Sequence, residues 1–444
     1  MGMPERYARE VPDVIKIWEP EGCFRTQTKI WIAQAEARSE LYGIPPIEQL
    51  DQIRNALSLS PEDIGYLTQA EGHETNKLLR LVQSKLPAEV GNVIHRGNTS
   101  SDVLDTSLAL QIKASLIIVK TDFTNLKDSL LSLALKHKGD LQIGRSHGQH
   151  AVPQTFDRQV LGWYGQIVRS IERIKQSKKV IAFGKCSGEI GTNVFIDPEL
   201  EKKSLAKLGL KPEPAPTQII PRDRHAEVSV LMAVNGACLA NIAMNLRLLA
   251  MTDVGEVREP FDPNTQQGSS AMPHKRNPEL AERICGLDRI ITASAFAELD
   301  TVKVWLERDI SHSSTERFVF PDLFGSLTYA ARLTKEIIDG LVVNSDRMLE
   351  NLNKTYGAIY SPRLFNALLE NGEMSRTQAY ELVKSMAQKA MDKKIPLWKL
   401  AAKNKSITKT LSRQELASLF NPDYYLRNID TAYKRLGIVF DSKK

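Results

Sequence analysis

Residues 262–278, DPNTQQGSSAMPHKRNP, combine hydroxyl, basic and turn-forming side chains. Ser269 and Ser270 follow a glycine, and Lys275 stands a few residues later beside an arginine. A hydroxyl near fixed cations is suited to proton transfer on an anionic substrate, because the cations stabilise the developing charge. Loops of this length without apolar periodicity are usually functional or disordered, so a mobile surface loop is the alternative interpretation.

Most histidines lie in polar or glycine-containing segments, between or at the ends of runs with helical periodicity. These seven are His73, His95, His147, His150, His225, His274 and His312. Their grouping predicts a site assembled from helix ends and loops, where histidine can exchange protons near neutral pH. For each histidine alone, a capping or hydrogen-bonded structural role is the competing interpretation.

Other chemistries find little support in the sequence. His147 and His150 have the spacing of two metal ligands, but no third ligand stands at a recognisable distance along the chain. The glycine pattern of SGEIGTN, 187–193, is too short for a dinucleotide loop, and no parallel-sheet pattern surrounds it. No GxSxG hydrolase motif occurs. We therefore expect neither a metal nor a cofactor.

Long helices must position these residues. Apolar residues recur at three- and four-residue spacing in 105–138, 156–180, 224–252, 278–304 and 315–353. The second half of 224–252 is apolar almost all round, which predicts a bundle core that several subunits could share. Alternating β-branched runs are scarce, so we expect a mainly α fold with at most small hairpins in the connections.

The pattern of helices predicts three domains. The first hundred residues show shorter helical pieces broken by proline and glycine, and another set of short helices follows TYGAIYSP. We predict an N-terminal helical domain at 1–104, a central long-helix bundle domain at 105–352 carrying the segment 262–278, and a C-terminal helical domain at 353–444.

The charge and cysteine content indicate which kinds of ligand and which compartment suit this chain. The chain has 444 residues and a net charge of +6, with its 59 lysines and arginines interleaved among 53 acidic residues. This distribution favours a pocket for a small anion over a nucleic-acid surface. The four widely spaced cysteines and the absence of an apolar leader or membrane-length apolar run predict a cytoplasmic protein without a membrane partner.

The segment GSSAMPHKRNP, 268–278, resembles the signature loop of the fumarase/aspartase superfamily in its adenylosuccinate lyase form. Further similar segments are ERYARE (5–10), HRGNTSSDVLDT (95–106), RSHGQHAVPQTF (145–156), TQIIPRDRHAE (217–227), WLERDISHSSTER (305–317) and SRTQAYELV (375–383). The resemblance implies a three-domain fold with a central helical bundle and an anti β-elimination that cleaves adenylosuccinate to AMP and fumarate. It also implies cleavage of the succinylated aminoimidazole carboxamide ribotide of purine biosynthesis.

The resemblance implies a catalytic role for each of several residues. Ser269 corresponds to the general base, His147 to the general acid, and Glu282 to the glutamate that holds the histidine in place. A free serine is a weak base, so closure of the loop must bring Lys275 and backbone N–H groups around its hydroxyl.

The remaining family positions are implied to hold the substrate. The positions near the succinyl carboxylates are Lys275, Asn277, Thr99 and Ser100. The positions near the phosphate are Arg6, Tyr7, Arg308, Ser313 and Arg317. His73 and His95 correspond to histidines near the nucleotide, and Gln218 and Arg283 to further substrate contacts. Arginine suits phosphate because its planar fork donates two parallel hydrogen bonds.

Several positions depart from the family pattern beside these motifs. They are Arg96, Asn98, Val152, Gln154 and Glu189. They leave the elimination chemistry intact but bear on which amine leaves. A related lyase acting on argininosuccinate or another succinyl-amine is therefore one alternative, and a non-catalytic structural paralogue is another.

The resemblance further implies a homotetramer in which each site draws on three chains. The apolar helix 224–252 is consistent with this assembly, since a helix apolar on all sides must be surrounded by neighbours. His147 and Ser269 of one site would then come from different polypeptides.

Overall fold

The computed structural model describes residues 2–261 and 272–439, and its contacts divide the chain into two compact units. Unit 1 comprises Met1–Leu126, Ile167–Ala243 and Glu282–Lys335, and unit 2 comprises Lys127–Gln166, Met244–Ala281 and Glu336–Lys444. Each unit thus combines three separate stretches of sequence. The division into domains at 104/105 and 352/353 stays a prediction.

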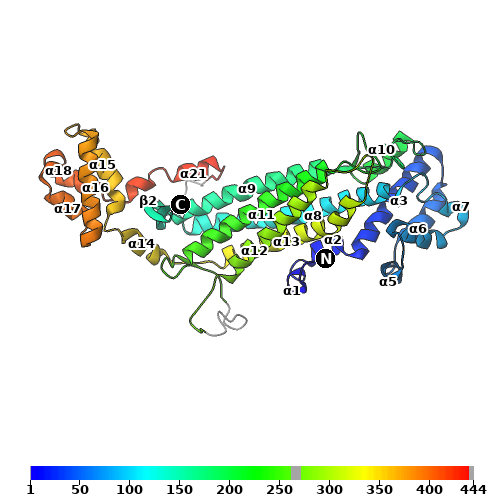
Figure 1. Cartoon of the computed structure of the whole chain (residues 1–444), viewed down its shortest axis with the longest axis horizontal. Coiled ribbons are helices and arrows are strands. Elements are labelled where there is room, and N and C mark those ends of the chain that lie inside the picture. The colour runs from blue at the N-terminus through cyan, green and yellow to red at the C-terminus, as the bar shows by residue number, and fades with distance from the viewer. Residues whose placement is uncertain (1, 262–271, 440–444) are drawn as a thin grey trace. The chain divides into compact units, whose positions relative to one another are not determined.

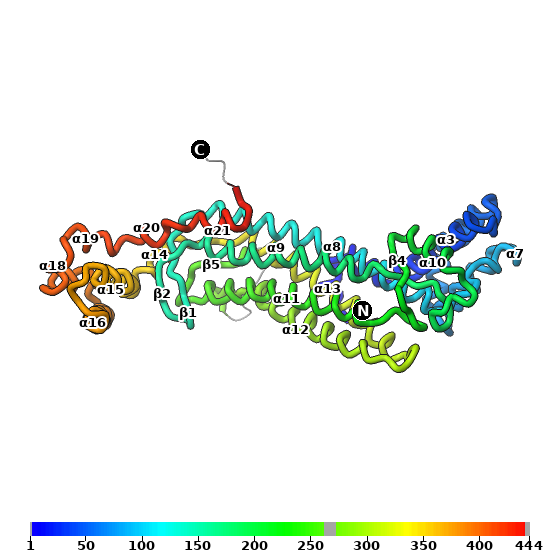
Figure 2. The backbone as a smooth tube through the Cα atoms, turned by 90° about the horizontal axis from the view of Figure 1, so that it is seen from above, coloured from blue at the N-terminus to red at the C-terminus, as the bar shows by residue number. Residues whose placement is uncertain are grey.

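Five long helices have residues in both units, and the course of each can be followed in Figures 1 and 2. They are α8 (Ser100–Lys136), α9 (Phe156–Val180), α11 (Asp223–Leu249), α12 (Glu279–Asp300) and α13 (Ser311–Asp339). The mainly α fold class expected from the apolar spacing is confirmed. Four of the five predicted helices agree with these bounds to within five residues.

The fifth predicted helix, 315–353, is wrong in its second half. Helix α13 ends at Asp339, strand β6 (Val342–Val343) follows, and a separate helix α14 runs from Ser345 to Asn353. A Cβ on Gly340 would lie only 2.7 Å from the Cβ of Pro260, and β6 pairs with β5 (Val257–Arg258). The chain turns there because it contacts a distant segment, which apolar periodicity does not report.

The shorter elements of unit 1 form the rest of its helical structure. They are α1 (Glu5–Ala8), α2 (Pro12–Trp18), α3 (Pro20–Tyr42), η1 (Ile47–Gln49), α4 (Leu50–Leu57), α5 (Pro61–Gln69), α6 (Glu74–Ser84), α7 (Ala88–Gly91), β3 (Phe183–Gly184), α10 (Pro198–Lys207) and β4 (Lys211–Pro212). The 23-residue α3 is longer than the pieces expected there. Its buried face mixes Trp31 with polar Gln27 and Gln34, which obscures the apolar pattern.

Unit 2 contains a hairpin and a cluster of small helices. The hairpin is β1 (Leu141–Ser146) with β2 (Gln149–Thr155), and the helices after α14 are η2 (Ala358–Tyr360), α15 (Ser361–Glu370), α16 (Arg376–Lys393), α17 (Leu397–Lys403), α18 (Lys405–Thr410), α19 (Arg413–Ser418), α20 (Asp423–Leu426) and α21 (Asp430–Arg435). Leu364, Val383 and Leu397 are among the buried residues that hold these helices together.

By length and composition, α11 is apolar enough to cross a membrane. Half of its most apolar 18-residue window is nevertheless buried inside the protein. The core helix of a bundle passes the same test, so the apolar character of α11 is accounted for by packing.

Candidate functional site

His147 lies at the tip of the β1–β2 hairpin in unit 2. Ser146 pairs with Gln149, so His147 and Gly148 form a two-residue turn, and their φ angles are +52° and +73°. Positive φ at both positions is the geometry of a type I′ turn. The imidazole is exposed, and the turn therefore presents it to solvent on a short, geometrically defined support.

The buried carboxylate of Glu256 accepts hydrogen bonds from residues of the hairpin. The two terminal guanidinium nitrogens of Arg145, Nη2 and Nη1, donate to it at 2.5 and 3.1 Å. Gln142 and Asn351 donate amide hydrogens to it at 2.9 and 2.7 Å. Glu256 is fully buried, so loss of Arg145 would leave an uncompensated charge. Glu256 lies 111 residues from Arg145 in sequence, and sequence reasoning did not identify it.

The described part of the signature loop begins at Met272. Lys275 is exposed, and its backbone N–H donates to the carbonyl of Met272 at 3.0 Å. Glu259 accepts hydrogen bonds from the backbone N–H groups of Leu280 and Ala281, at 3.1 and 2.7 Å. Its carboxylate therefore satisfies the free donors at the start of α12 and connects the residue before the loop to the helix after it. Asn277 lies in this described segment, whereas Ser269 and Ser270 lie outside the described residues.

In unit 1, Asp102 fixes the segment that carries Thr99 and Ser100. Its carboxylate accepts the backbone N–H of Thr99 at 2.7 Å, in the manner of a capping box at the start of α8. It also accepts the N–H of Ser187 at 3.0 Å and the ammonium of Lys185 at 2.6 Å. Both Asp102 and Lys185 are fully buried, so the ion pair ties the start of α8 to the 185–188 segment.

Arg222 joins three segments that supply predicted substrate contacts. Its guanidinium donates two hydrogen bonds to Asp105 of α8, at 2.8 and 2.9 Å, and its Nε lies 2.7 Å from Glu316 of α13. Burial would raise the pKa of Asp105, but the charge of Arg222 outweighs burial and lowers that pKa to about 2. Asp105 is therefore ionised, and the pair holds α8, α13 and the segment before α11 in register.

His95 is held by an aromatic partner. Its φ is +63°, and the Trp31 indole N–H of α3 donates to its Nδ1 at 3.2 Å. Burial, with a contribution from the charge of His73, lowers the pKa of His95 to about 4. At neutral pH the ring is uncharged with its proton on Nε2, so it can donate a hydrogen bond from that atom.

Arg317 is paired in this chain. It donates to Glu74 at 3.2 Å, and Gln27 of α3 donates to the other oxygen of Glu74 at 2.6 Å. Glu74 directly follows His73 at the start of α6. Neither Gln27 nor Glu74 was identified from the sequence, because their contacts are made between helices far apart in the chain.

Arg308 and Gln218 are brought together, at 3.4 Å from Nη1 to Oε1. His312 is buried at the start of α13, one residue before Ser313. Burial, followed by the charge of Arg222, lowers the pKa of His312 to about 4, so the ring is neutral at physiological pH.

Arg6, Tyr7 and Arg283 form a separate group with Tyr329. The two tyrosine rings stack with centroids 5.1 Å apart, Arg283 donates to the Tyr329 hydroxyl at 2.9 Å, and Arg6 lies 5.0 Å from the Tyr7 centroid. On α13, Tyr329 and Arg317 are twelve residues apart, which corresponds to about 18 Å along the helix. Within one chain, the predicted phosphate ligands therefore do not form one cluster.

The residues that depart from the family pattern differ in their surroundings: two form amide hydrogen bonds and two are exposed. Asn98 and Gln34 of α3 exchange two amide hydrogen bonds, at 2.9 and 2.7 Å, and Gln154 donates to Gln142 at 3.3 Å. Glu189 and Val152 are exposed. Burial, with a contribution from the charge of Arg96, lowers the pKa of Arg38.

Glu298 of α12 is a buried carboxyl that we expect to be protonated at neutral pH. Burial and the charge of Glu316 raise its pKa to about 8, while the Thr301 hydroxyl donates to it at 3.1 Å. In the unfolded chain this carboxyl ionises near its ordinary pKa of 4.5. Below pH 4.5 it is protonated in both states, so the folded state has its full stability. Between pH 4.5 and 8 the unfolded chain releases this proton while the folded chain retains it, so the free energy of unfolding falls as the pH rises.

Glu298→Gln cannot ionise but keeps an oxygen for Thr301. Between pH 5 and pH 8.5 the parent should therefore lose stability relative to this variant, and the Tm of the variant minus that of the parent should increase. The expected change in the free energy of unfolding is a few kcal/mol, at about 1.4 kcal/mol per pKa unit. Circular-dichroism melts at three pH values measure the trend. Glu279→Gln, at an exposed position of the same helix, is the control. A difference that is constant with pH would show that Glu298 titrates normally.

The chain is similar to known proteins over nearly its whole length. Residues 30–291 match a family model described as lyase, and residues 357–436 match one described as adenylosuccinate lyase C-terminus. The adenylosuccinate lyase of Aquifex aeolicus is 37% identical over 436 residues, covering 98% of this chain and 99% of the relative. The adenylosuccinate lyase of Bacillus subtilis is 36% identical over 436 residues, covering 98% of this chain and 100% of the relative.

The solved structure of a fumarate lyase from Mesorhizobium sp. BNC1 has the same fold. It superposes with a TM-score of 0.85 at 24% identity, covering 96% of this chain and 97% of that chain. A 3-carboxy-cis,cis-muconate lactonizing enzyme from Pseudomonas putida also gives a TM-score of 0.85, at 25% identity and with 96% of each chain covered.

Proposed function

This chain belongs to the adenylosuccinate lyase family of the fumarase/aspartase superfamily, and from that premise we propose that it cleaves adenylosuccinate to AMP and fumarate. The observation that carries the proposal is the similarity to adenylosuccinate lyases, at 35–38% identity over 98% of the chain. The enzyme is a lyase, and the substrate is a small nucleotide. The succinylated aminoimidazole carboxamide ribotide is its second substrate.

The elimination divides proton transfer between two residues. Ser269 removes a proton from the succinyl carbon next to a carboxylate, and the resulting carbanion is stabilised as an aci-carboxylate. The carbon–nitrogen bond then breaks with its electron pair passing to nitrogen, which takes a proton from His147. The exposed position of His147 on its two-residue turn supports this role, since the ring is accessible to a departing amine.

Other residues bind and orient the substrate. Lys275, Asn277, Thr99 and Ser100 hold the succinyl carboxylates, and Glu282 positions His147. The phosphate is held by Arg6, Tyr7, Arg308, Ser313 and Arg317, while His73, His95, Gln218 and Arg283 make further contacts with the nucleotide. The neutral state of His95 supports a role as a hydrogen-bond donor, because its Nδ1 is already occupied by Trp31.

The active enzyme is a homotetramer whose sites combine residues of different subunits. Support comes from α11, where Val230, Val234, Met244 and Leu248 are exposed, at 39%, 39%, 52% and 53%. They form two pairs, each four residues apart, that lie on one face of the helix, and an exposed apolar face of this kind is stable in water only when another helix covers it. The separation of Arg6 and Tyr7 from Arg317 on one chain also favours a shared site.

A reducing cytoplasm is the compartment we assign. All four cysteines are free thiols in the described structure, which is typical of proteins kept reduced.

The substrate assignment is tested with purified protein and adenylosuccinate, following loss of its ultraviolet absorbance and the release of fumarate. Turnover of both purine-pathway substrates is expected. Fumarate release from argininosuccinate or another succinyl-amine, with none from adenylosuccinate, would refute the substrate while retaining the elimination. Absence of fumarate from every succinyl-amine would favour a structural paralogue.

Arg308→Ala is expected chiefly to weaken substrate binding. A guanidinium that binds the phosphate equally in the ground and transition states contributes to KM and little to kcat, and one charged hydrogen bond corresponds to about a tenfold rise in KM or more. Steady-state kinetics with adenylosuccinate separate the two parameters. Arg9→Ala, an exposed arginine near the N-terminus, is the control. A fall in kcat at unchanged KM would assign Arg308 to the reaction itself.

A further inference from the structure

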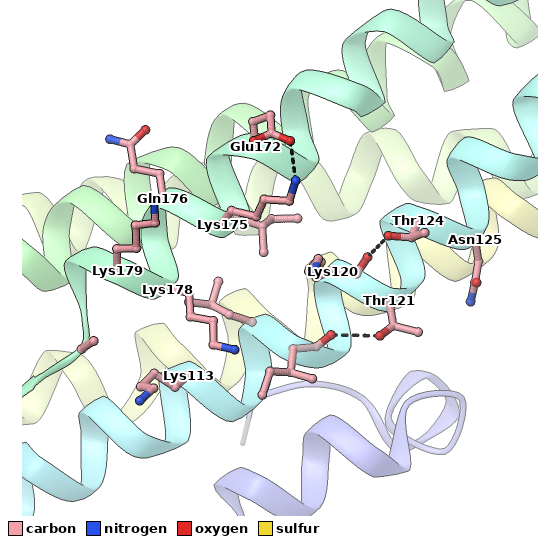
Figure 3. A pocket seen from close by; sticks show the side chains of 14 residues that line it. Lys113, Lys120, Thr121, Thr124, Asn125, Glu172, Lys175, Gln176, Lys178 and Lys179 are labelled. Carbon is pink, nitrogen blue, oxygen red and sulfur yellow. Dashed lines mark hydrogen bonds and ion pairs between the residues drawn. The ribbon is translucent and has the colours of Figure 1, made fainter. Parts of the chain in front are cut away.

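A groove between α8 and α9 in unit 1 is lined mainly by lysines, and none of its residues belongs to the proposed active site. Its volume is about 1070 Å³. Figure 3 shows the two helices on either side of the hollow, with lysines contributed by both. They are Lys113 and Lys120 from α8, and Lys175, Lys178 and Lys179 from α9.

The positive charge of this groove is poorly compensated. Glu172 is the one carboxylate among its lining residues, and it is already paired with Lys175 at 2.6 Å. Lys113 donates to the backbone carbonyl of Gly209 at 2.6 Å, which neutralises no charge. Within the described chain, Lys120, Lys178 and Lys179 form no ion pair with a carboxylate. Four ammonium groups thus remain without a counter-charge.

Two of these lysines repel one another. Burial, with the charge of Lys178, lowers the pKa of Lys113. Both residues line the same groove, Lys113 from α8 and Lys178 from α9 (Figure 3). An anion between the two ammonium groups would relieve this repulsion and would be attracted by both charges.

The spacing of the cations indicates an elongated ligand. Lys113 and Lys120 are seven residues apart, which is about 10 Å along one face of α8. Lys175, Lys178 and Lys179 occupy one face of α9 across the groove. A single carboxylate could reach only one end of this array, whereas an anion with charges along its length could contact both rows.

One exposed apolar side chain lies between the charges. It is Ile117 of α8, which is 51% exposed, whereas Leu116 and Ile174, which also line the groove, are buried. The lining contains no arginine, whose planar fork is suited to carboxylates. Lysine is a compact point charge and a common ligand of phosphate oxygens.

We propose that this groove binds a polyphosphate chain, either free or carried by a nucleotide whose base packs against the exposed Ile117. The chain would lie between the lysine rows of α8 and α9. The lining of the groove includes none of the residues proposed to bind the substrate nucleotide.

Isothermal titration calorimetry of the full-length protein with inorganic tripolyphosphate tests the proposal. Saturable binding is expected, with an affinity that falls as salt is added. The double variant Lys120→Glu/Lys178→Glu should bind at least about tenfold more weakly, because two attractive charges become repulsive. Lys120→Gln/Lys178→Gln should lose less, and it guards against misfolding of the charge-reversed protein. Lys136→Glu, at an exposed position of the same helix outside the groove, should bind as the parent does.

Further titrations separate the possible sources of the phosphate and the possible sites. ATP binding that is tighter than that of tripolyphosphate and is weakened by Lys120→Glu/Lys178→Glu would assign the groove to a nucleotide, and equal affinity would assign it to the phosphate chain alone. Arg308→Ala should leave tripolyphosphate binding unchanged. Binding that is lost in Arg308→Ala, weakened equally by Lys136→Glu, or never saturable would overturn the proposal.

Discussion

His147→Ala and Ser269→Ala are each expected to lower kcat by roughly 10³-fold or more, with a smaller effect on substrate affinity. General acid and base catalysis each contribute about 10² to 10⁴ to a rate, and these residues act on the reacting atoms. Stopped-flow absorbance with adenylosuccinate measures turnover, and equilibrium binding to the inactive variants measures affinity.

Matched variants separate chemistry from structure. Asparagine is favoured at the first position of a type I′ turn before glycine, so His147→Asn should fold at least as well as the parent. It should still be as inactive as His147→Ala. Near-normal activity of His147→Asn would mean that His147 serves only the turn. Ser270→Ala is the control for Ser269→Ala, and a larger loss in Ser270→Ala would move the general base to the neighbouring hydroxyl.

Mixed tetramers of His147→Ala and Ser269→Ala should regain activity that neither variant has alone. If the two residues of a site come from different chains, random mixing in equal amounts leaves each intact with probability one half. About a quarter of the sites should then recover. The variants are mildly denatured together, renatured and assayed with adenylosuccinate, and each variant treated alone is the control.

Exchange of subunits must be demonstrated in the same sample, for example by native mass spectrometry of one isotope-labelled variant. Recovery near one quarter would support the shared site. Demonstrably mixed tetramers without recovery would place His147 and Ser269 of each site on one polypeptide.

Local sequence patterns determined the mainly α fold class and most of the long helices. The helices α9, α11 and α12 follow from apolar residues at three- and four-residue spacing, because this periodicity is a property of neighbouring residues. The sequence allowed small hairpins in the connections but did not place one at His147; the hairpin tip there, with its positive φ angles at His147 and Gly148, is known only from the structure.

Only the tertiary structure decided which side chains support the site. Arg222 contacts Asp105 across 117 positions, Arg145 contacts Glu256 across 111, and Trp31 contacts His95 across 64. The end of α13 at Asp339 depends in the same way on Pro260 packing against Gly340. Periodicity and turn chemistry act over a few residues, whereas pairing of buried charges is set by which helices pack together, and that becomes definite only when the chain has folded.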